Sequence, residues 1–312
     1  MAKEQIIKKE KFGDKLKRDL RQNAALYILV LPVLVFYTLF CYKPMYGAII
    51  AFKDYTPKLG IMGSPWVGLK HFQGFITNPY FARILKNTLG ISVTTLICSF
   101  PAPILLALLI NEIRSRKYAK IVQTMSYLPH FISLVVVCSL IKEFTASNGL
   151  INDFLAVFGV KRQTMLNNPS MFLPVYVISD IWQGIGWGSI IYLAALTGID
   201  QQLYEAAQID GANRWKQILN ITIPGIMPTV IIMLILRVGQ LMNVGYEKII
   251  LLYNPSIYET SDVISSFVYR QGILERNYSY SAAVGLFNSV INCILLFGSN
   301  CVSRKLNNTS LW

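Results

Sequence analysis

Two apolar stretches of the sequence carry residues that can bind a polar solute. Stretch 171–198 contains Asp180, Trp182, Gln183 and Trp187, and stretch 223–243 contains Arg237, Gln240 and Asn243. Polar and charged side chains are costly in hydrocarbon, so those within a membrane span face a cavity or a partner. Guanidinium, amide and carboxylate groups form hydrogen bonds with polar solutes, and indole rings stack on the flat apolar faces of a ligand. We expect these side chains to line a substrate pathway in the outer half of the membrane.

Asp180 and Arg237 also allow a purely structural interpretation. Counted from the outer end of each stretch at about 1.5 Å per residue, their depths differ by only about 5 Å. The two charges can therefore neutralise each other as an ion pair, or Arg237 can bind substrate. The sequence allows both, and one arginine can serve both roles.

Catalytic and metal-binding motifs are largely missing from the sequence. It contains no G-x-x-x-x-G-K-[ST] phosphate loop and no G-x-S-x-G nucleophile elbow. Its five cysteines form no C-x-x-C pair, and it has only two histidines. The sequence predicts a non-catalytic chain without a metal site or a bound cofactor, so that any ATP and Mg²⁺ belong to another chain.

The polar segment 199–222 separates two apolar stretches and has an ordered pattern of its own. Glu205, Ala206 and Ala207 begin a run of good helix formers that ends at Asp210-Gly211, and glycine is the usual residue for a left-handed helix end. A short second helix is expected next, with Trp215, Ile218 and Leu219 on one face. Pro224 suits the first turn of the following span. The alanines give a small surface for close approach to a cleft, and Glu205 and Asp210 offer charge to a basic partner.

Composition indicates an all-α integral membrane protein. Of the 312 residues, 54% are hydrophobic and 14% are charged, whereas soluble domains contain about 25% charged residues. A span needs about 20 apolar helical residues. Six stretches approach this length, near 24–42, 88–110, 124–141, 171–198, 223–243 and 282–302. The third is the weakest, because Pro129 and His130 interrupt its inner end.

The distribution of basic residues predicts the orientation. The segments 1–23, 111–123, 199–222 and 303–312 hold sixteen Lys and Arg, and the longer loops on the other side hold twelve. The positive-inside bias places both termini and the loop 199–222 in the cytoplasm. We therefore expect a basic tail 1–23, a membrane domain 24–302 and a tail 303–312. Because the basic residues are spread over membrane-flanking loops, they favour anionic lipid and not nucleic acid.

The spacing E-A-A-x3-G-x9-I-x-[apolar]-P resembles the EAA loop of permease subunits in binding-protein-dependent ABC importers. Outer-loop and span elements are similar to those of six-span sugar permeases, namely Trp66-Val67-Gly68-Leu69, Asn78-Pro79, Asn87-Thr88, Leu128-Pro129 and Gly149-Leu150-Ile151-Asn152. The run 245–250 with Tyr253-Asn254-Pro255 resembles the polysaccharide-type, LplB-like branch. That branch usually has Glu-Gln where this chain has Glu247-Lys248.

The resemblance implies a transmembrane permease subunit that forms half of the pathway of an ATP-driven oligosaccharide importer in a bacterial plasma membrane. It implies a second permease as a heteromeric partner, a dimer of ATP-binding-cassette ATPases and an extracellular solute-binding lipoprotein. The residues expected to couple the chain to the ATPase are Glu205, Ala206, Ala207, Asp210, Gly211 and Pro224.

Other functional classes stay open at this point. A secondary transporter, or a permease for another polar solute, would also place polar side chains in the spans. A secondary transporter would however need a complete pathway and coupling-ion sites in one chain. An intramembrane enzyme would need clustered carboxylates or a metal site at the membrane face. A homodimer is the alternative to a heteromer.

Overall fold

The computed structural model describes residues 12–307 and 310–311. Within them the chain folds into helices and loops, and the extended pairing is limited to one isolated bridge between Lys53 and Trp66. This confirms the predicted all-α fold. The first eleven residues of the predicted tail 1–23, and residues 308–309 and 312 of the tail 303–312, lie outside the described residues.

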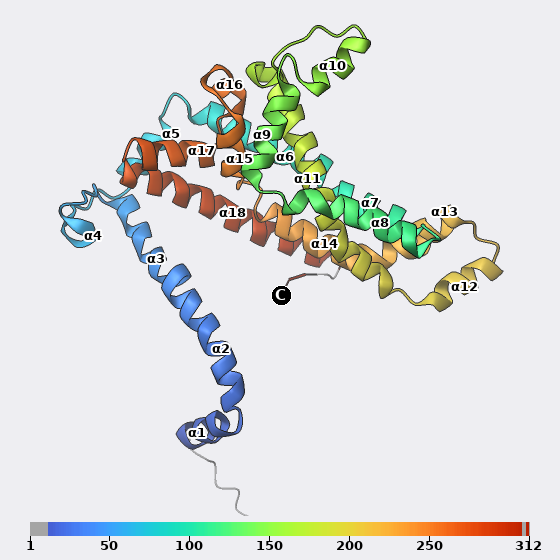
Figure 1. Ribbon diagram of the computed structural model, residues 1–312. Coiled ribbons are helices and arrows are strands. Elements are labelled where there is room, and N and C mark those ends of the chain that lie inside the picture. The colour runs from blue at the N-terminus through green and yellow to red at the C-terminus, as the bar shows by residue number, and fades with distance from the viewer. Residues whose placement is uncertain (1–11, 308–309, 312) are drawn as a thin grey trace, which may run out of the picture.

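Six helical spans form the membrane domain (Figure 1). They are α2 (Ala24–Phe36, extended by α3, Lys43–Met45), α6 with α7 (Phe81–Ser99 and Pro101–Asn111), α9 (Leu134–Thr145), α11 (Pro169–Thr197), α14 (Ile223–Val238) and α18 (Tyr278–Asn307). Five regions of the described chain are long and apolar enough to cross a membrane, namely Ala24–Phe52, Phe81–Asn111, Leu134–Val157 (α9 through α10), Arg214–Val238 and Tyr278–Lys305. The sixth, α11, has 29 residues, and Asp180 and Gln183 lower its hydropathy.

The remaining helices belong to the tail, the loops and the breaks within spans. The α-helices are α1 (Phe12–Gln22), α4 (Gly60–Gly63), α5 (Lys70–Ile76), α8 (Arg116–Tyr127), α10 (Leu150–Val157), α12 (Gln201–Ile209), α13 (Arg214–Gln217), α15 (Tyr246–Leu252), α16 (Tyr258–Ser261) and α17 (Ile264–Tyr269). Short 3₁₀ segments cover Tyr46–Phe52, Leu128–Phe131, Met165–Asn167 and Pro255–Ile257. Wider π-helical turns cover Tyr37–Tyr42, Ile218–Thr222 and Arg270–Leu274.

The third span differs from its prediction over 124–141. Helix α8 ends at Tyr127, a 3₁₀ turn covers Leu128–Phe131, and α9 begins after Ser133. Pro129 has no N–H to donate to a helical hydrogen bond, and Ser133 restarts the helix by accepting a hydrogen bond from the backbone N–H of Val136 at 3.4 Å. The predicted stretch 124–141 therefore contains parts of two helices joined at a bend, and the span itself begins at α9.

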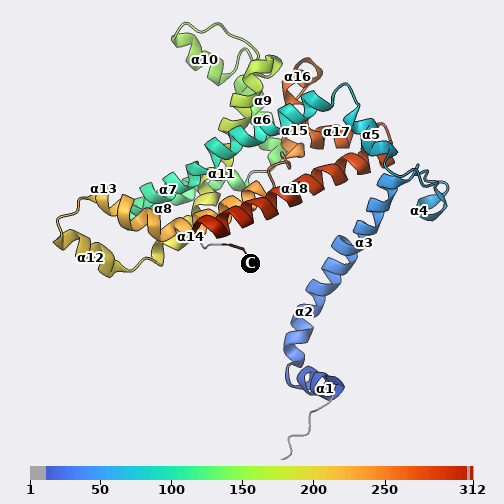
Figure 2. The same ribbon diagram turned by 180° about the vertical axis from the view of Figure 1, so that it is seen from behind.

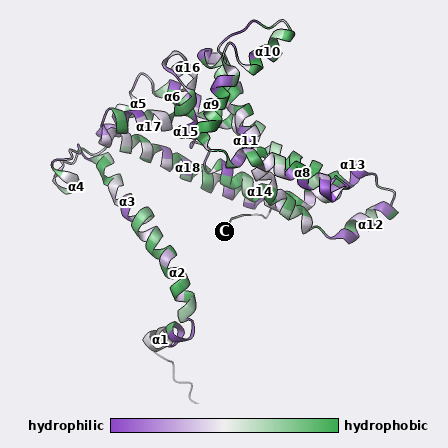
Figure 3. Cartoon of the chain, viewed as in Figure 1, coloured by the Kyte–Doolittle hydropathy of each residue, from purple (hydrophilic) through white to green (hydrophobic). Residues whose placement is uncertain are grey.

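The first span stands apart from the other five. Helix α2 projects away from them in both views (Figures 1 and 2), and none of its residues is buried. Apolar residues cover this helix along its length, whereas polar residues are frequent in the α12–α13 loop (Figure 3). Helix α2 thus covers no part of the chain's own core, and its apolar surface is available to lipid or to another chain.

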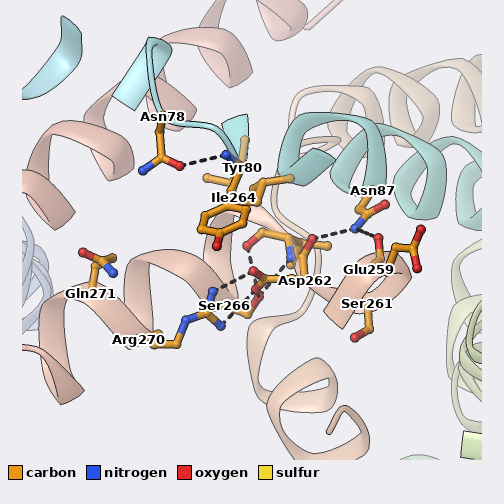
Figure 4. A network of polar contacts seen from close by, with 12 residues as sticks. Asn78, Tyr80, Asn87, Glu259, Ser261, Asp262, Ile264, Ser266, Arg270 and Gln271 are labelled. Atoms are coloured by element: carbon orange, nitrogen blue, oxygen red, sulfur yellow. Dashed lines mark hydrogen bonds and ion pairs between the residues drawn. The ribbon is translucent and has the colours of Figure 1, made fainter. Parts of the chain in front are cut away.

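A buried ion pair fixes the segment that precedes α18 (Figure 4). The guanidinium of Arg270 donates two hydrogen bonds to the carboxylate of Asp262, at 3.2 and 2.6 Å, and the Ser266 hydroxyl donates a third at 2.8 Å. The Asn87 side chain on α6 donates to the backbone oxygens of Glu259 and Asp262 at 2.8 and 3.0 Å. The network therefore holds α16 and α17 against α6.

Asp262→Ala should destabilise the protein strongly. The Asp262 side chain is 1% exposed, so its removal leaves Arg270 as a charge without its partner, which costs about 3–5 kcal/mol. The surface pair between Asp153 and Arg162 provides the matched control, because both side chains are about half exposed and such pairs contribute about 0–1 kcal/mol. Thermal unfolding in detergent should show a much lower midpoint for Asp262→Ala than for Asp153→Ala. Equal midpoints would contradict a stabilising role for the buried pair.

Candidate substrate cavity and coupling loop

Five of the seven predicted pathway residues line one cavity of about 260 Å³ between α6, α11, the end of α14 and α15. We call it the polar cavity. The five are Asp180, Gln183, Arg237, Gln240 and Asn243. Ser92 and Thr95 of α6, Tyr176 of α11 and Lys248 of α15 complete the polar part of its wall. Helices far apart in the sequence therefore bring the predicted polar groups together.

A second cavity of about 290 Å³ adjoins the polar cavity, and Asp180 and Arg237 line both. Its wall includes Gly184 and Gly188 of α11 and Tyr192 further along that helix. A Cβ atom added to Gly188 would lie 2.9 Å from the Pro103 side chain, so this glycine permits close packing of α11 on α7. Gly184 instead faces open space, since no other atom lies within 4 Å of its ideal Cβ position.

Helix α14 ends at Val238, before two of the residues that the sequence placed in its span. Gly239 packs tightly, because an added Cβ would lie 2.5 Å from the Leu296 side chain. Gln240 and Asn243, which were expected within the span, lie on the irregular segment 239–245 that follows α14. Irregular backbone at membrane depth is tolerated where it is buried in protein or lines a cavity. This segment lines the polar cavity.

Side chains hydrogen-bond the irregular segment and hold its shape. The backbone N–H of Met242 donates to Asn292 Oδ1 at 3.0 Å, and Ser265 donates to the Val244 carbonyl oxygen at 3.0 Å. Asn288 and Asn292 of α18 donate to Asn243 Oδ1 at 2.9 and 3.0 Å. Because both partners bind the oxygen of Asn243, its amide nitrogen can donate into the cavity.

Asp180 has a different ionic partner from the one considered in the sequence. Its Oδ1 lies 3.9 Å from Nζ of Lys248, which is also 3.4 Å from the Tyr176 carbonyl oxygen and 4.9 Å from the Tyr176 ring centroid. No ion pair joins Asp180 to Arg237 in the part of the chain that the structure describes. From the sequence, Lys248 was noted only as a departure from the LplB-like branch and not as a pathway residue. The lysine within the apolar run 248–252 was the available signal.

The two predicted tryptophans lie outside the polar cavity. Trp182 is two residues from Asp180, on the opposite side of α11, and lines a separate apolar cavity between α9, α10 and α11. Trp187 shares the face of Asp180 but lies about 10 Å further along the helix. There its ring stacks on that of His130, with centroids 4.6 Å apart and planes 4° apart. Neither indole therefore lines the polar cavity, and a role of the two tryptophans in the pathway stays a prediction.

The loop 199–222 forms the predicted helix and left-handed turn. Asp200 caps α12 by accepting a hydrogen bond from the Gln202 backbone N–H at 2.9 Å. Gly211 has a φ of 73°. The backbone N–H of Ala212 donates to the Ala207 oxygen at 2.8 Å, and that of Gly211 to the Gln208 oxygen at 3.1 Å. This pair of bonds is a Schellman end, in which glycine at the left-handed position costs least strain.

The second helix of this loop is continuous with the next span, contrary to the prediction of a separate short helix. Helix α13, the π-helical turn and α14 form one run from Arg214 to Val238. Pro224 lies in the first turn of α14, immediately after the wider turn. A proline inside a helix removes one backbone hydrogen bond and crowds the preceding turn. The wider turn gives it room, with the Ile223 N–H donating to the Ile218 oxygen.

Charged and apolar residues are exposed together on this loop. Glu205, Ala206, Asp210 and Gly211 are exposed, and Ala207 is half-buried. Ile209 is 87% exposed and Trp215 is 73% exposed. The Tyr204 hydroxyl lies 2.9 Å from Thr222 Oγ1, which ties α12 to the base of α14. The loop therefore presents large apolar side chains beside charged ones on an element that is tied to α14.

Known proteins resemble this chain over most of its length. Residues 99–308 match the model of the family described as "Binding-protein-dependent transport system inner membrane component". The chain is 43% identical to the polygalacturonan/rhamnogalacturonan transport system permease protein YteP of Bacillus subtilis (strain 168), covering 98% of this chain and 96% of YteP. It is 42% identical to the protein LplB of the same organism, covering 94% and 92% of the two chains.

A solved structure has the same fold. It is a chain of a bacterial ABC transporter involved in the import of the acidic polysaccharide alginate, with a TM-score of 0.86 and 43% identity over 94% of this chain and 99% of that chain. The matched family model covers residues 99–308, which include the polar cavity residues from Asp180 to Lys248 and the whole loop 199–222. The chain therefore belongs to the family of inner-membrane components of binding-protein-dependent transport systems.

Proposed function

We propose that this chain forms half of the translocation pathway of an ATP-driven oligosaccharide importer. The observation that carries the proposal is that two helices connect the polar cavity to the loop 199–222. Helix α11 carries Asp180 and leads into the loop 199–222, and α14 leaves that loop and carries Arg237. Asp180 lies about 25 Å along α11 from the loop, at about 1.5 Å per residue. A force applied to the loop therefore reaches both walls of the cavity through two rigid helices.

The proposed source of that force is a dimer of ATP-binding-cassette ATPases, which would bind ATP and Mg²⁺. This chain carries no phosphate-loop motif in its sequence, so it would hydrolyse no ATP itself. Glu205, Ala206, Ala207, Asp210 and Gly211 would form the docking surface together with the exposed Ile209 and Trp215. Pro224 would fix the angle at which the loop joins α14.

A second permease chain would complete the pathway. Helix α2 covers no part of this chain's core, which suits a helix that packs on a neighbouring chain as well as on lipid. The polar cavity has a single set of charged residues, Asp180, Arg237 and Lys248. An oligosaccharide has different ends and faces, so a partner with different side chains would suit it better than a second copy. We therefore propose a heteromer.

The substrate class rests on the named relatives. YteP is named for polygalacturonan and rhamnogalacturonan, a second solved structure is an alginate transporter in complex with an alginate pentasaccharide-bound periplasmic protein, and AraP, at 30% identity, is named for arabinooligosaccharides. We propose an oligosaccharide that an extracellular binding lipoprotein delivers. The basic segments would keep both termini and the loop 199–222 at the cytoplasmic face of a bacterial plasma membrane.

ATP-dependent uptake into proteoliposomes tests this function. The complex isolated with its permease and ATPase partners should accumulate oligosaccharide only with internal ATP and external loaded binding protein. Vesicles with an ion gradient but no ATP provide the control. Uptake driven by the gradient alone would favour the alternative, a secondary transporter.

A further inference from the structure

The polar cavity is charged unevenly. Two basic side chains, Arg237 and Lys248, and one carboxylate, Asp180, line it. Lys248 is already engaged, because its side chain is 6% exposed and its Nζ lies between Asp180 Oδ1 at 3.9 Å and the Tyr176 carbonyl oxygen at 3.4 Å. The ion pair neutralises Lys248 and Asp180, which is the one carboxylate among the described residues of the cavity wall. One positive charge is left over.

That remaining charge is on Arg237. The structure gives it no ion pair or hydrogen bond to a described residue, and its side chain lines both cavities at their junction. Gln240, three residues on, and Gln183 of α11 lie in the same wall. A cation without a counter-charge is unfavourable at membrane depth. The planar guanidinium is suited to a bidentate contact with a carboxylate, and the two amides can donate to the neighbouring hydroxyls.

We propose that Arg237 binds the carboxylate of an acidic sugar unit. The ion pair with Lys248 makes this possible, because it keeps Asp180 from pairing with Arg237. This inference rests on the proposed import function and adds the charge of the preferred sugar and the residues that select it. Lys248 acts here as a positioning residue that need not touch the substrate. A neutral sugar would leave the arginine without a counter-charge, so the cavity discriminates by charge as well as by shape.

The arrangement predicts an unusual effect of Lys248. In Lys248→Met, Asp180 loses its partner and becomes available to Arg237, which lines the same two cavities. The arginine is then neutralised from within the chain, and the acidic preference is lost although Arg237 is intact. In the double variant Lys248→Met with Asp180→Asn, Arg237 is again the only charge, so the preference returns. Replacing a buried ion pair by neutral groups of similar size is often neutral for stability.

The test is equilibrium binding to the purified permease–ATPase complex in nanodiscs, without binding protein, so that only the permease cavity selects. The probes are labelled trigalacturonate and a neutral galactose trisaccharide with the same linkage. The unmodified complex should bind trigalacturonate on the order of tenfold more tightly, as one charge-assisted contact provides. Arg237→Gln and Lys248→Met should each remove this preference, and the double variant should restore it. The melting temperature of each variant separates lost selectivity from lost folding.

Four results would overturn the inference about Arg237 and Lys248. Equal binding of the two trisaccharides by the unmodified complex, or no binding of trigalacturonate, would overturn the inference. So would a retained preference in Lys248→Met, or a double variant that folds and shows none. These binding results do not test the proposed import function. That function is tested separately by ATP-dependent uptake of any oligosaccharide.

Discussion

Gly211→Val should abolish ATP-driven uptake while the protein stays in the membrane at its normal level. The backbone at Gly211 has a φ of 73°. A residue with a Cβ at a left-handed position costs about 1–2 kcal/mol, and a β-branched side chain is disfavoured most. The chain can relieve that strain by unwinding the last turn of α12, which moves Ala206 and Ala207. Uptake into proteoliposomes, normalised to incorporated protein, should fall to background.

The matched control at this position is Gly211→Asn. Asparagine adopts the left-handed conformation far more readily than valine, so this variant should retain most of the uptake. Glu205→Lys tests the docking charge separately, because the side chain is exposed and its reversal leaves the fold intact. The Glu205→Lys variant should lose uptake, because the new lysine would be repelled by a basic partner surface. Normal transport by Gly211→Val or Glu205→Lys would refute the docking assignment.

Gly184→Leu should block transport without unfolding the chain. No atom lies within 4 Å of the ideal Cβ position of Gly184, and the position opens into the second cavity of about 290 Å³. Leucine is a better helix former than glycine by roughly 1 kcal/mol, so the helix itself gains stability. The new side chain would fill the space next to Arg237. The uptake assay should show a loss of transport, and the melting temperature should be equal to or above that of the unmodified chain.

Gly298→Leu is the control for this substitution. Gly298 is also a helical glycine with open space around its Cβ, but it lies on an exposed face of α18 away from both cavities. It should transport nearly as well as the unmodified chain. If Gly184→Leu transports equally well, the second cavity is not part of the pathway.

The loop 199–222 was the most predictable part of the chain, because its structure depends on neighbours in sequence. The Asp210-Gly211 end of α12 follows from the low strain of glycine at positive φ, which operates in any context. The continuity of α13 with α14 was missed, since Pro224 was taken as the start of a new helix, whereas the π-helical turn at Ile218–Thr222 carries the helix past it. The role of these residues in docking stays a prediction.

Most residues of the polar cavity could be predicted from the sequence, but their contacts could not. Asp180, Gln183, Arg237, Gln240 and Asn243 were found because polar residues in apolar stretches are conspicuous. Their partners were not found, since the Asp180–Lys248 contact joins α11 to a helix after the end of α14. The end of α14 at Val238 was also missed, although Gly239 follows it directly in the sequence. Trp187 was named from the sequence as a pathway residue, but its stacking on His130 was not foreseen.

The requirement for two different permease chains in ATP-driven uptake tests the central claim most directly. Proteoliposomes should be prepared with this chain, the ATPase, loaded binding protein and the second permease, and compared with vesicles that lack one component at a time. We expect oligosaccharide uptake and the accompanying ATP hydrolysis only in the complete set. Uptake by this chain with the ATPase and the binding protein alone would contradict a heteromeric pathway. Uptake without the ATPase would contradict the account as a whole.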